Sequence, residues 1–274
     1  MSNFEHDYLA LVCRVIAQGT RRASRAGPTL SCFGGVLQID CLEQGHFPIL
    51  TQRQVHTTGV LGELAAFLRG ATTVAEFKQH GCNYWDANAA AWPTNKDAAK
   101  GELSVGKIYG YQWRRWEGKL DQVAMLLGSL RTNPESRRHL LTTYNPAQLD
   151  EMCLPPCHLL AQYNVRRTGQ LDCIVYMRSV DLCLGLPSDI VLYAALLLIL
   201  CHETGYTPGK LTFMLGDTHV YQNHVGQFAL HGVREMRALP TFELAACTVD
   251  NFVPSNLRLI NYQHSGALSY AFNV

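Results

Sequence analysis

Cys157 and His158 stand side by side directly behind two prolines. Proline restricts the backbone, so this order holds one thiol rigidly at the start of an apolar stretch. A thiolate is a strong nucleophile, and it forms near neutral pH where positive charge lies close by. Arg137, Arg138 and Arg178 stand in adjoining segments and are the candidates to supply that charge. Taken alone, such a pair is more often a structural feature of a buried strand than a catalytic one.

Glu63 is a second candidate, because it is a single carboxylate among apolar neighbours in a helical pattern over residues 60–68. A carboxylate in such a place is either a general acid or base or an ordinary solvated helix residue. Metal chemistry has little support, since no cysteines form a Cys-x-x-Cys pair and the nearest spacing is Cys153 to Cys157. We therefore expect no metal.

The composition is that of a folded protein without a global charge field. The 274 residues are 47% hydrophobic and 16% charged, and 23 Lys and Arg balance 22 Asp and Glu. Disorder and a nucleic-acid-binding surface are therefore disfavoured, and any phosphate must be held in a local site. The sequence begins without a signal-peptide pattern, so the ten cysteines indicate a reducing cytoplasm rather than a disulfide scaffold.

The elements that must position these groups follow from hydrophobic periodicity and turn residues. A mixture of strands and helices without repeats predicts one α+β domain. The apolar run at 190–201 is too short to span a bilayer and predicts a buried helix. The predicted helices are 8–16, 60–68, 120–130 and 190–201; the strands are 159–165, 171–177, 211–215 and a pair within 30–42 about a turn at Gly34-Gly35; the loops are 19–28 and 87–104.

Four blocks of sequence together resemble thymidylate synthase and its pyrimidine hydroxymethylase relatives. They are LPPCH (154–158), SRRHLLTTYNP (136–146), MRSVDLCLGLPSDI (177–190) and GDTHVYQNH (216–224), and the resemblance runs in order from about Asp7 to beyond Tyr221. It implies the thymidylate synthase fold, in which residues 1–274 form one catalytic domain with a large mixed β-sheet flanked by helices. It also implies a homodimer packed sheet to sheet.

The resemblance assigns a catalytic set to five residues. Cys157 matches the nucleophile that adds to C6 of a pyrimidine, which makes C5 a nucleophile towards a methylene group carried by tetrahydrofolate. Glu63 matches the carboxylate that organises proton transfer through water, and Tyr109 matches the tyrosine near C5 deprotonation. His158, beside the nucleophile, and Asp189, at the base, complete the set. Without the motif context, Glu63 would be read as a solvated carboxylate and Tyr109 as a core aromatic residue.

The resemblance also implies two binding regions and a shared site. Four guanidinium groups would hold the nucleotide phosphate, and two of them would come from the other subunit of a homodimer. The co-substrate would be 5,10-methylenetetrahydrofolate. The nucleotide residues are Arg25, Arg178, Ser179, Asp189, His219 and Tyr221, with Arg137 and Arg138 from the partner; the folate residues are Trp85, Asp181, Leu184, Gly185 and Val274.

Asp189 departs from the synthases, which carry asparagine at this position. An amide both donates and accepts, as the O4 and N3–H edge of uracil requires, whereas an ionised carboxylate only accepts. Cytosine presents an amino group there, so Asp189 matches cytosine and should repel uracil. Met177 agrees, because the synthases usually have glutamine before Arg178 and Ser179 and the deoxycytidylate hydroxymethylases resemble this chain. The expected substrate is dCMP.

The product depends on whether water reaches an exocyclic methylene intermediate. Asn88 and Ser188 replace a tryptophan and a phenylalanine of the synthases, which predicts a wetter pocket and 5-hydroxymethyl-dCMP. Trp85 and the apolar end 270–274 favour the alternative, 5-methyl-dCMP. CMP or dUMP as substrate, and a non-catalytic nucleotide- or RNA-binding relative, are further alternatives. Activities of this kind typically supply modified bases for bacteriophage DNA, so a viral enzyme would act in the host cytoplasm.

Overall fold

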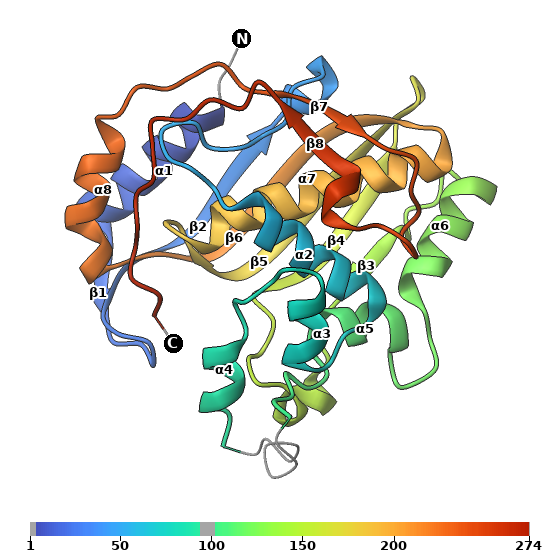
Figure 1. The fold of residues 1–274 in the computed structure, drawn as a ribbon, viewed down its shortest axis with the longest axis horizontal. Coiled ribbons are helices and arrows are strands. Elements are labelled where there is room, and N and C mark those ends of the chain that lie inside the picture. Colours follow the sequence, from blue (N-terminus) through green and yellow to red (C-terminus); the bar gives the residue numbers. More distant parts are fainter. Residues whose placement is uncertain (1–3, 94–101, 274) are drawn as a thin grey trace.

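A six-stranded mixed sheet forms the centre of the protein (Figure 1). The computed structural model describes residues 4–93 and 102–273. The strand order is β1-β2-β6-β5-β4-β3, in which β5 and β6 are parallel and the other neighbours are antiparallel. The strands are β1 (Thr20–Arg22), β2 (Thr29–Ile39), β3 (Leu140–Thr142), β4 (His158–Val165), β5 (Gln170–Asp181) and β6 (Thr207–Tyr221), with a separate hairpin of β7 (Thr241–Leu244) and β8 (Leu257–Ile260).

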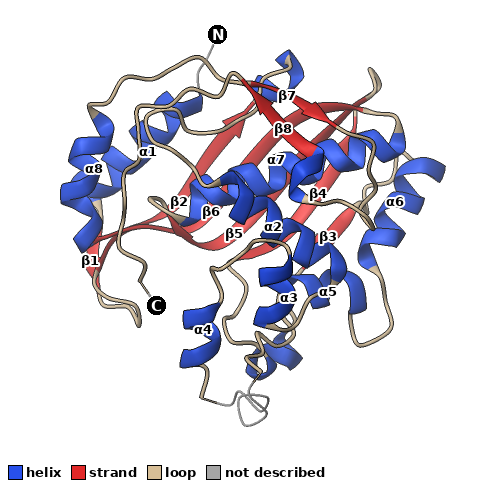
Figure 2. Ribbon diagram, viewed as in Figure 1, coloured by secondary structure: helices blue, strands red, loops and turns tan. Residues whose placement is uncertain are grey.

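Helix α7 (Gly185–Thr204) lies across the sheet and carries α2 (Thr57–Arg69) on its outer side (Figure 2). It is apolar on almost every face, as expected of a helix buried on all sides. Among the described residues it is the one helix long and apolar enough to cross a membrane, and its burial marks it as a core helix. The other helices are α1 (Phe4–Gln18), α3 (Val74–Gln79), α4 (Asp86–Ala91), α5 (Tyr109–Arg115), α6 (Gln122–Thr132) and α8 (Val225–Gly232).

The predicted strand pair at 30–42 is wrong. Strand β2 runs unbroken through both glycines, because β6 pairs with it from Thr29 to Ile39. Gly34 adopts a φ of 89°, which glycine tolerates. The chain therefore continues as one strand here and does not form a hairpin turn. The predicted loop at 19–28 contains the edge strand β1, and the predicted loop at 87–104 begins inside α4. The remaining predicted helices and strands are present, with ends displaced by a few residues.

One region of the sheet exposes apolar side chains. Val36, Met214 and Tyr176 lie in one row across β2, β6 and β5, because Met214 is the register partner of both of the others. The three are 63%, 44% and 40% exposed. Together with Phe33 on β2 and Ile174 on β5 they form what we call the sheet patch. Contiguous exposed apolar residues of this kind usually mark an interaction surface.

Candidate active site

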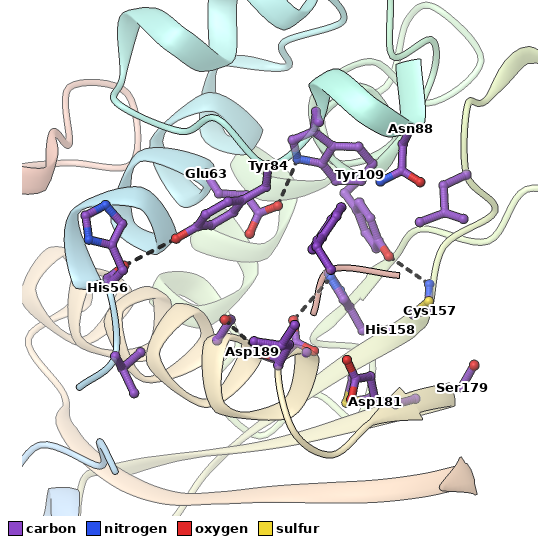
Figure 3. A pocket seen from close by; sticks show the side chains of 18 of the residues that line it. His56, Glu63, Tyr84, Asn88, Tyr109, Cys157, His158, Ser179, Asp181 and Asp189 are labelled. Carbon is purple, nitrogen blue, oxygen red and sulfur yellow. Dashed lines mark hydrogen bonds and ion pairs between the residues drawn. The ribbon is translucent and has the colours of Figure 1, made fainter. Parts of the chain in front are cut away.

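A pocket of about 420 Å³ opens where β4 and α7 begin (Figure 3). Helix α2, the start of α5, the segment leading into α4 and the end of β5 also line it. Ten of the residues to which the family resemblance assigns a catalytic or binding role line this one pocket. They are Glu63, Trp85, Tyr109, Cys157, His158, Ser179, Asp181, Leu184, Gly185 and Asp189.

Cys157 stands at the pocket edge, immediately before β4. Its backbone N–H donates to the Tyr109 hydroxyl at 2.7 Å. Arg178 holds the segment before Cys157 in place, because its guanidinium group donates to the carbonyls of Pro156 at 2.7 Å and Pro155 at 2.8 Å. Burial raises the pKa of the Cys157 thiol, and the positive charge of Arg178 opposes that rise. The site therefore fixes the backbone that carries the thiol and supplies a nearby cation for the thiolate.

Glu63 projects from α2 into the same pocket. The indole N–H of Trp85 donates to Glu63 Oε1 at 2.9 Å. Burial raises the pKa of Glu63 to about 7, and the Trp85 hydrogen bond opposes the rise. Near neutral pH the carboxyl group is therefore present in both proton states, which is the condition for a general acid or base.

His158 lies between two tyrosines. Its ring stacks on Tyr109 with centroids 3.9 Å apart and planes inclined by 16°. Its Nδ1 atom is 2.7 Å from the Tyr193 hydroxyl. Burial lowers the pKa of His158 to about 3, so the imidazole is neutral at physiological pH. A neutral ring has one donor and one acceptor nitrogen, and this gives the pocket a group of fixed polarity.

Asp189 lies in the first turns of α7, with Oδ1 3.9 Å from His158 Nε2. Burial raises the pKa of Asp189 well above its ordinary value, and the negative charges of Glu63 and Asp181 raise it further. Both effects favour the protonated, neutral form of the carboxyl group over the ionised carboxylate, which can only accept hydrogen bonds. A neutral carboxyl both donates and accepts.

Comparison with known proteins identifies the family. A family model described as thymidylate synthase matches residues 6–274. The curated protein "Thymidylate synthase 1/2" of Encephalitozoon cuniculi (strain GB-M1) is 40% identical over 252 residues, which cover 86% of this chain and 84% of that protein. The chain belongs to the thymidylate synthase family. Its α+β fold with a large mixed sheet is thereby confirmed, and so is enzymatic one-carbon transfer with methylenetetrahydrofolate as co-substrate.

Apolar side chains also line the pocket of this thymidylate synthase family member. They include Trp85, Leu184 and Phe272, and Asp181 lines the same pocket. Apolar walls with a few polar groups suit a flat heterocycle such as the pterin of a reduced folate. Phe272 belongs to the C-terminal segment, which Asn273 ties to the Asn223 side chain at 3.0 Å.

The remaining predicted residues lie outside this pocket. Arg178 lies directly behind Cys157, and Tyr221 packs edge to face on His219 with centroids 5.3 Å apart. Arg25 is exposed and lies close enough to Tyr221 to lower that residue's pKa, although burial raises it overall. Arg137 and Arg138 are exposed beyond the end of α6 and do not line the pocket of their own chain, and Val274 lies outside the described residues.

Sequence reasoning missed two buried residues of the site. Tyr193 stands within a run of apolar helix residues, and its spacing of four from Asp189 was the signal that places both on one helix face. Arg53 lines the pocket, donates to the Cys183 carbonyl at 2.6 Å and lies 5.4 Å from the Tyr270 ring centroid. It thereby links the pocket wall to the C-terminal segment.

Proposed function

We propose that this family member transfers a one-carbon unit to C5 of dCMP and releases 5-hydroxymethyl-dCMP. The observation that carries the proposal is the carboxyl group of Asp189, which is 17% exposed and shares one pocket with Cys157, Glu63 and Tyr109. A non-catalytic nucleotide-binding relative is disfavoured, because binding alone requires neither a positioned thiol nor a carboxyl group that titrates near pH 7.

The choice of base follows from the donors and acceptors of Asp189. Cytosine presents an acceptor at N3 and a donor at its exocyclic amine. A neutral carboxyl group can pair with both, because its O–H donates to N3 and its carbonyl oxygen accepts from the amine. Uracil presents the opposite order, with a donor at N3 and an acceptor at O4. An amide at this position matches uracil when its carbonyl oxygen faces N3–H and its N–H faces O4. The named relative is a thymidylate synthase, so activity on dUMP is the outcome that opposes the proposal.

The chemistry assigns one bond change to each group. The Cys157 sulfur bonds to C6 and the displaced electron pair makes C5 nucleophilic. C5 bonds to the methylene carbon of the folate, which is at the oxidation level of formaldehyde, and the bond from that carbon to the folate nitrogen then breaks. Tyr109 and Glu63, the latter through water, accept the C5 proton and return a proton to the departing folate amine. Water then adds to the exocyclic methylene and the sulfur leaves C6, so dCMP, methylenetetrahydrofolate and water give 5-hydroxymethyl-dCMP and tetrahydrofolate.

The pocket lining favours water as the last reactant. Asn88 and Ser188 give it polar walls, and the Ser188 hydroxyl donates to the Leu184 carbonyl at 3.0 Å. A second candidate product is 5-methyl-dCMP, which forms when tetrahydrofolate gives a hydride and becomes dihydrofolate. The apolar walls at Trp85 and Phe272 favour that outcome by excluding water.

The quaternary proposal is a homodimer joined through the sheet patch. Family members act as dimers, and the patch offers an apolar surface on β2, β5 and β6. Arg137 and Arg138 are exposed and outside their own pocket, so they are free to reach the phosphate bound by a partner chain. Sedimentation should give twice the chain mass, and Met214→Lys in the patch should shift the protein towards monomer.

The decisive experiment is mass spectrometry of the product formed from dCMP and methylenetetrahydrofolate. Methyl and hydroxymethyl products differ by one oxygen, and dihydrofolate absorbance reports the methyl route independently. We expect hydroxymethyl product without dihydrofolate. Parallel reactions with dUMP and CMP measure selectivity, and a kcat/KM for dUMP above that for dCMP contradicts the proposal. Release of tritium from 5-tritiated dCMP should disappear in Cys157→Ser, because C5 exchange requires addition at C6.

A further inference from the structure

The hydroxyl group of Tyr193 contacts the pocket residue His158. Tyr193 lies on α7 one turn beyond Asp189, and its side chain is 1% exposed. Among the described residues its hydroxyl has one hydrogen-bond partner, the Nδ1 atom of His158 at 2.7 Å. His158 is itself 4% exposed, so water does not compete for this contact. The pair joins the core helix to the pocket.

The hydrogen bond selects one tautomer of His158. The ring carries one proton, because burial lowers its pKa to about 3. If that proton were on Nδ1, the Tyr193 O–H would face another donor and would be left buried without an acceptor, which is costly. The arrangement in which Tyr193 donates to Nδ1 satisfies both groups. The proton of His158 is then on Nε2.

The Nε2–H of His158 faces Oδ1 of Asp189 across 3.9 Å (Figure 3). Such contacts commonly shorten when a substrate closes the site. A donor at this place favours the state in which Oδ1 is the carbonyl oxygen and Oδ2 carries the carboxyl proton. The two oxygens of Asp189 thus become unequal, although a carboxyl group by itself accepts its proton at either.

We propose that the Tyr193 hydroxyl, acting through the His158 ring, fixes which oxygen of Asp189 carries the proton and thereby sets the preference between cytosine and uracil. This inference rests on the proposed function, in which Asp189 reads the base. Cytosine and uracil present opposite orders of donor and acceptor at N3 and C4. A carboxyl group with a free proton matches either base by moving it, whereas one of fixed polarity matches a single base. Tyr193 is a positioning residue and does not touch substrate.

The first test measures the tautomer directly. Nitrogen chemical shifts of ¹⁵N-histidine-labelled protein distinguish Nδ1–H from Nε2–H, and the His158 signals are those missing from His158→Gln. We expect Nε2–H in the native protein and a mixture with Nδ1–H in Tyr193→Phe. A native ring protonated on Nδ1 overturns the inference. This readout needs no turnover, so it stands whichever nucleotide is the substrate.

The second test measures selectivity as the ratio of kcat/KM for dCMP and dUMP. Tyr193→Phe should reduce the native preference by roughly tenfold, with dCMP losing efficiency and dUMP gaining it. Tyr163→Phe is the matched control, since Tyr163 is equally buried on β4 and does not line the pocket, and its ratio should stay within twofold of native. An unchanged ratio in Tyr193→Phe overturns the inference. A native preference for dUMP instead contradicts the proposed function, and the relay then predicts a tenfold shift towards dCMP.

Discussion

The carboxyl groups of Glu5 and Glu63 belong to helices of one core and differ in the donors that face them. Glu5 on α1 accepts from the Thr51 N–H at 2.6 Å, the Thr51 hydroxyl at 2.5 Å and the Gln52 N–H at 3.2 Å. Within residues 4–93 and 102–273, Glu63 on α2 accepts one hydrogen bond, from Trp85. A carboxylate surrounded by donors is stable as an ion and serves structure, whereas one desolvated with a single donor holds its proton near pH 7 and is available for chemistry.

Replacing Glu63 by Gln tests the chemical side of this contrast and has the largest expected effect. The amide keeps the shape and the Trp85 hydrogen bond but cannot exchange a proton. We expect kcat to fall by about 10²–10⁴-fold, the usual contribution of a general acid or base. Steady-state kinetics measure the loss, and nucleotide binding by calorimetry should stay within about threefold of native. A kcat within fivefold of native would show that Glu63 moves no proton.

The role of one of these two glutamates could be predicted from the sequence, and the role of the other could not. Glu63 was predictable, because its apolar helical context and the family motifs both point to it. The role of Glu5 was not, since its donors stand 46 and 47 positions away and depend on the path of the loop. The same reason hid the continuity of β2, which only its pairing with β6 reveals. The raised pKa of Asp189 was likewise out of reach, because burial rather than residue type decides it.

The pH dependence of stability should expose the cost of ionising Glu63. Its folded pKa of about 7 exceeds the ordinary value of 4.5, so the folded state binds the proton more tightly. The resulting stabilisation is fully present below pH 4.5 and is lost as pH rises through 7. Relative to Glu63→Gln, the native protein should lose up to about 3 kcal/mol over this window. Urea unfolding of both proteins at several pH values measures the difference, and parallel curves would refute it.

Replacing Glu5 by Gln tests the structural side. An amide cannot accept from all the donors of Thr51 and Gln52 without turning its own N–H towards one of them. We expect a loss of about 2 kcal/mol in the free energy of unfolding, because a buried donor is left without a partner. The loop continues into Arg53 at the pocket wall, so KM should rise modestly while kcat stays within tenfold of native. If kcat falls as far as in Glu63→Gln, the division between the two glutamates is wrong.

The Trp85→Phe substitution removes the hydrogen bond between the indole and Glu63. Of these substitutions it should have the smallest effect. The indole N–H opposes the rise in the pKa of Glu63, so its loss should raise that pKa further, by less than about one unit, or roughly 1 kcal/mol. The basic form of the carboxyl group then appears at higher pH, and the rising limb of the kcat profile should move in the same direction. Phenylalanine keeps an aromatic ring beside Phe67 and Phe77, which limits the effect on packing. A limb that moves to lower pH would mean that Trp85 disfavours the ionised carboxylate, contrary to the hydrogen bond at 2.9 Å.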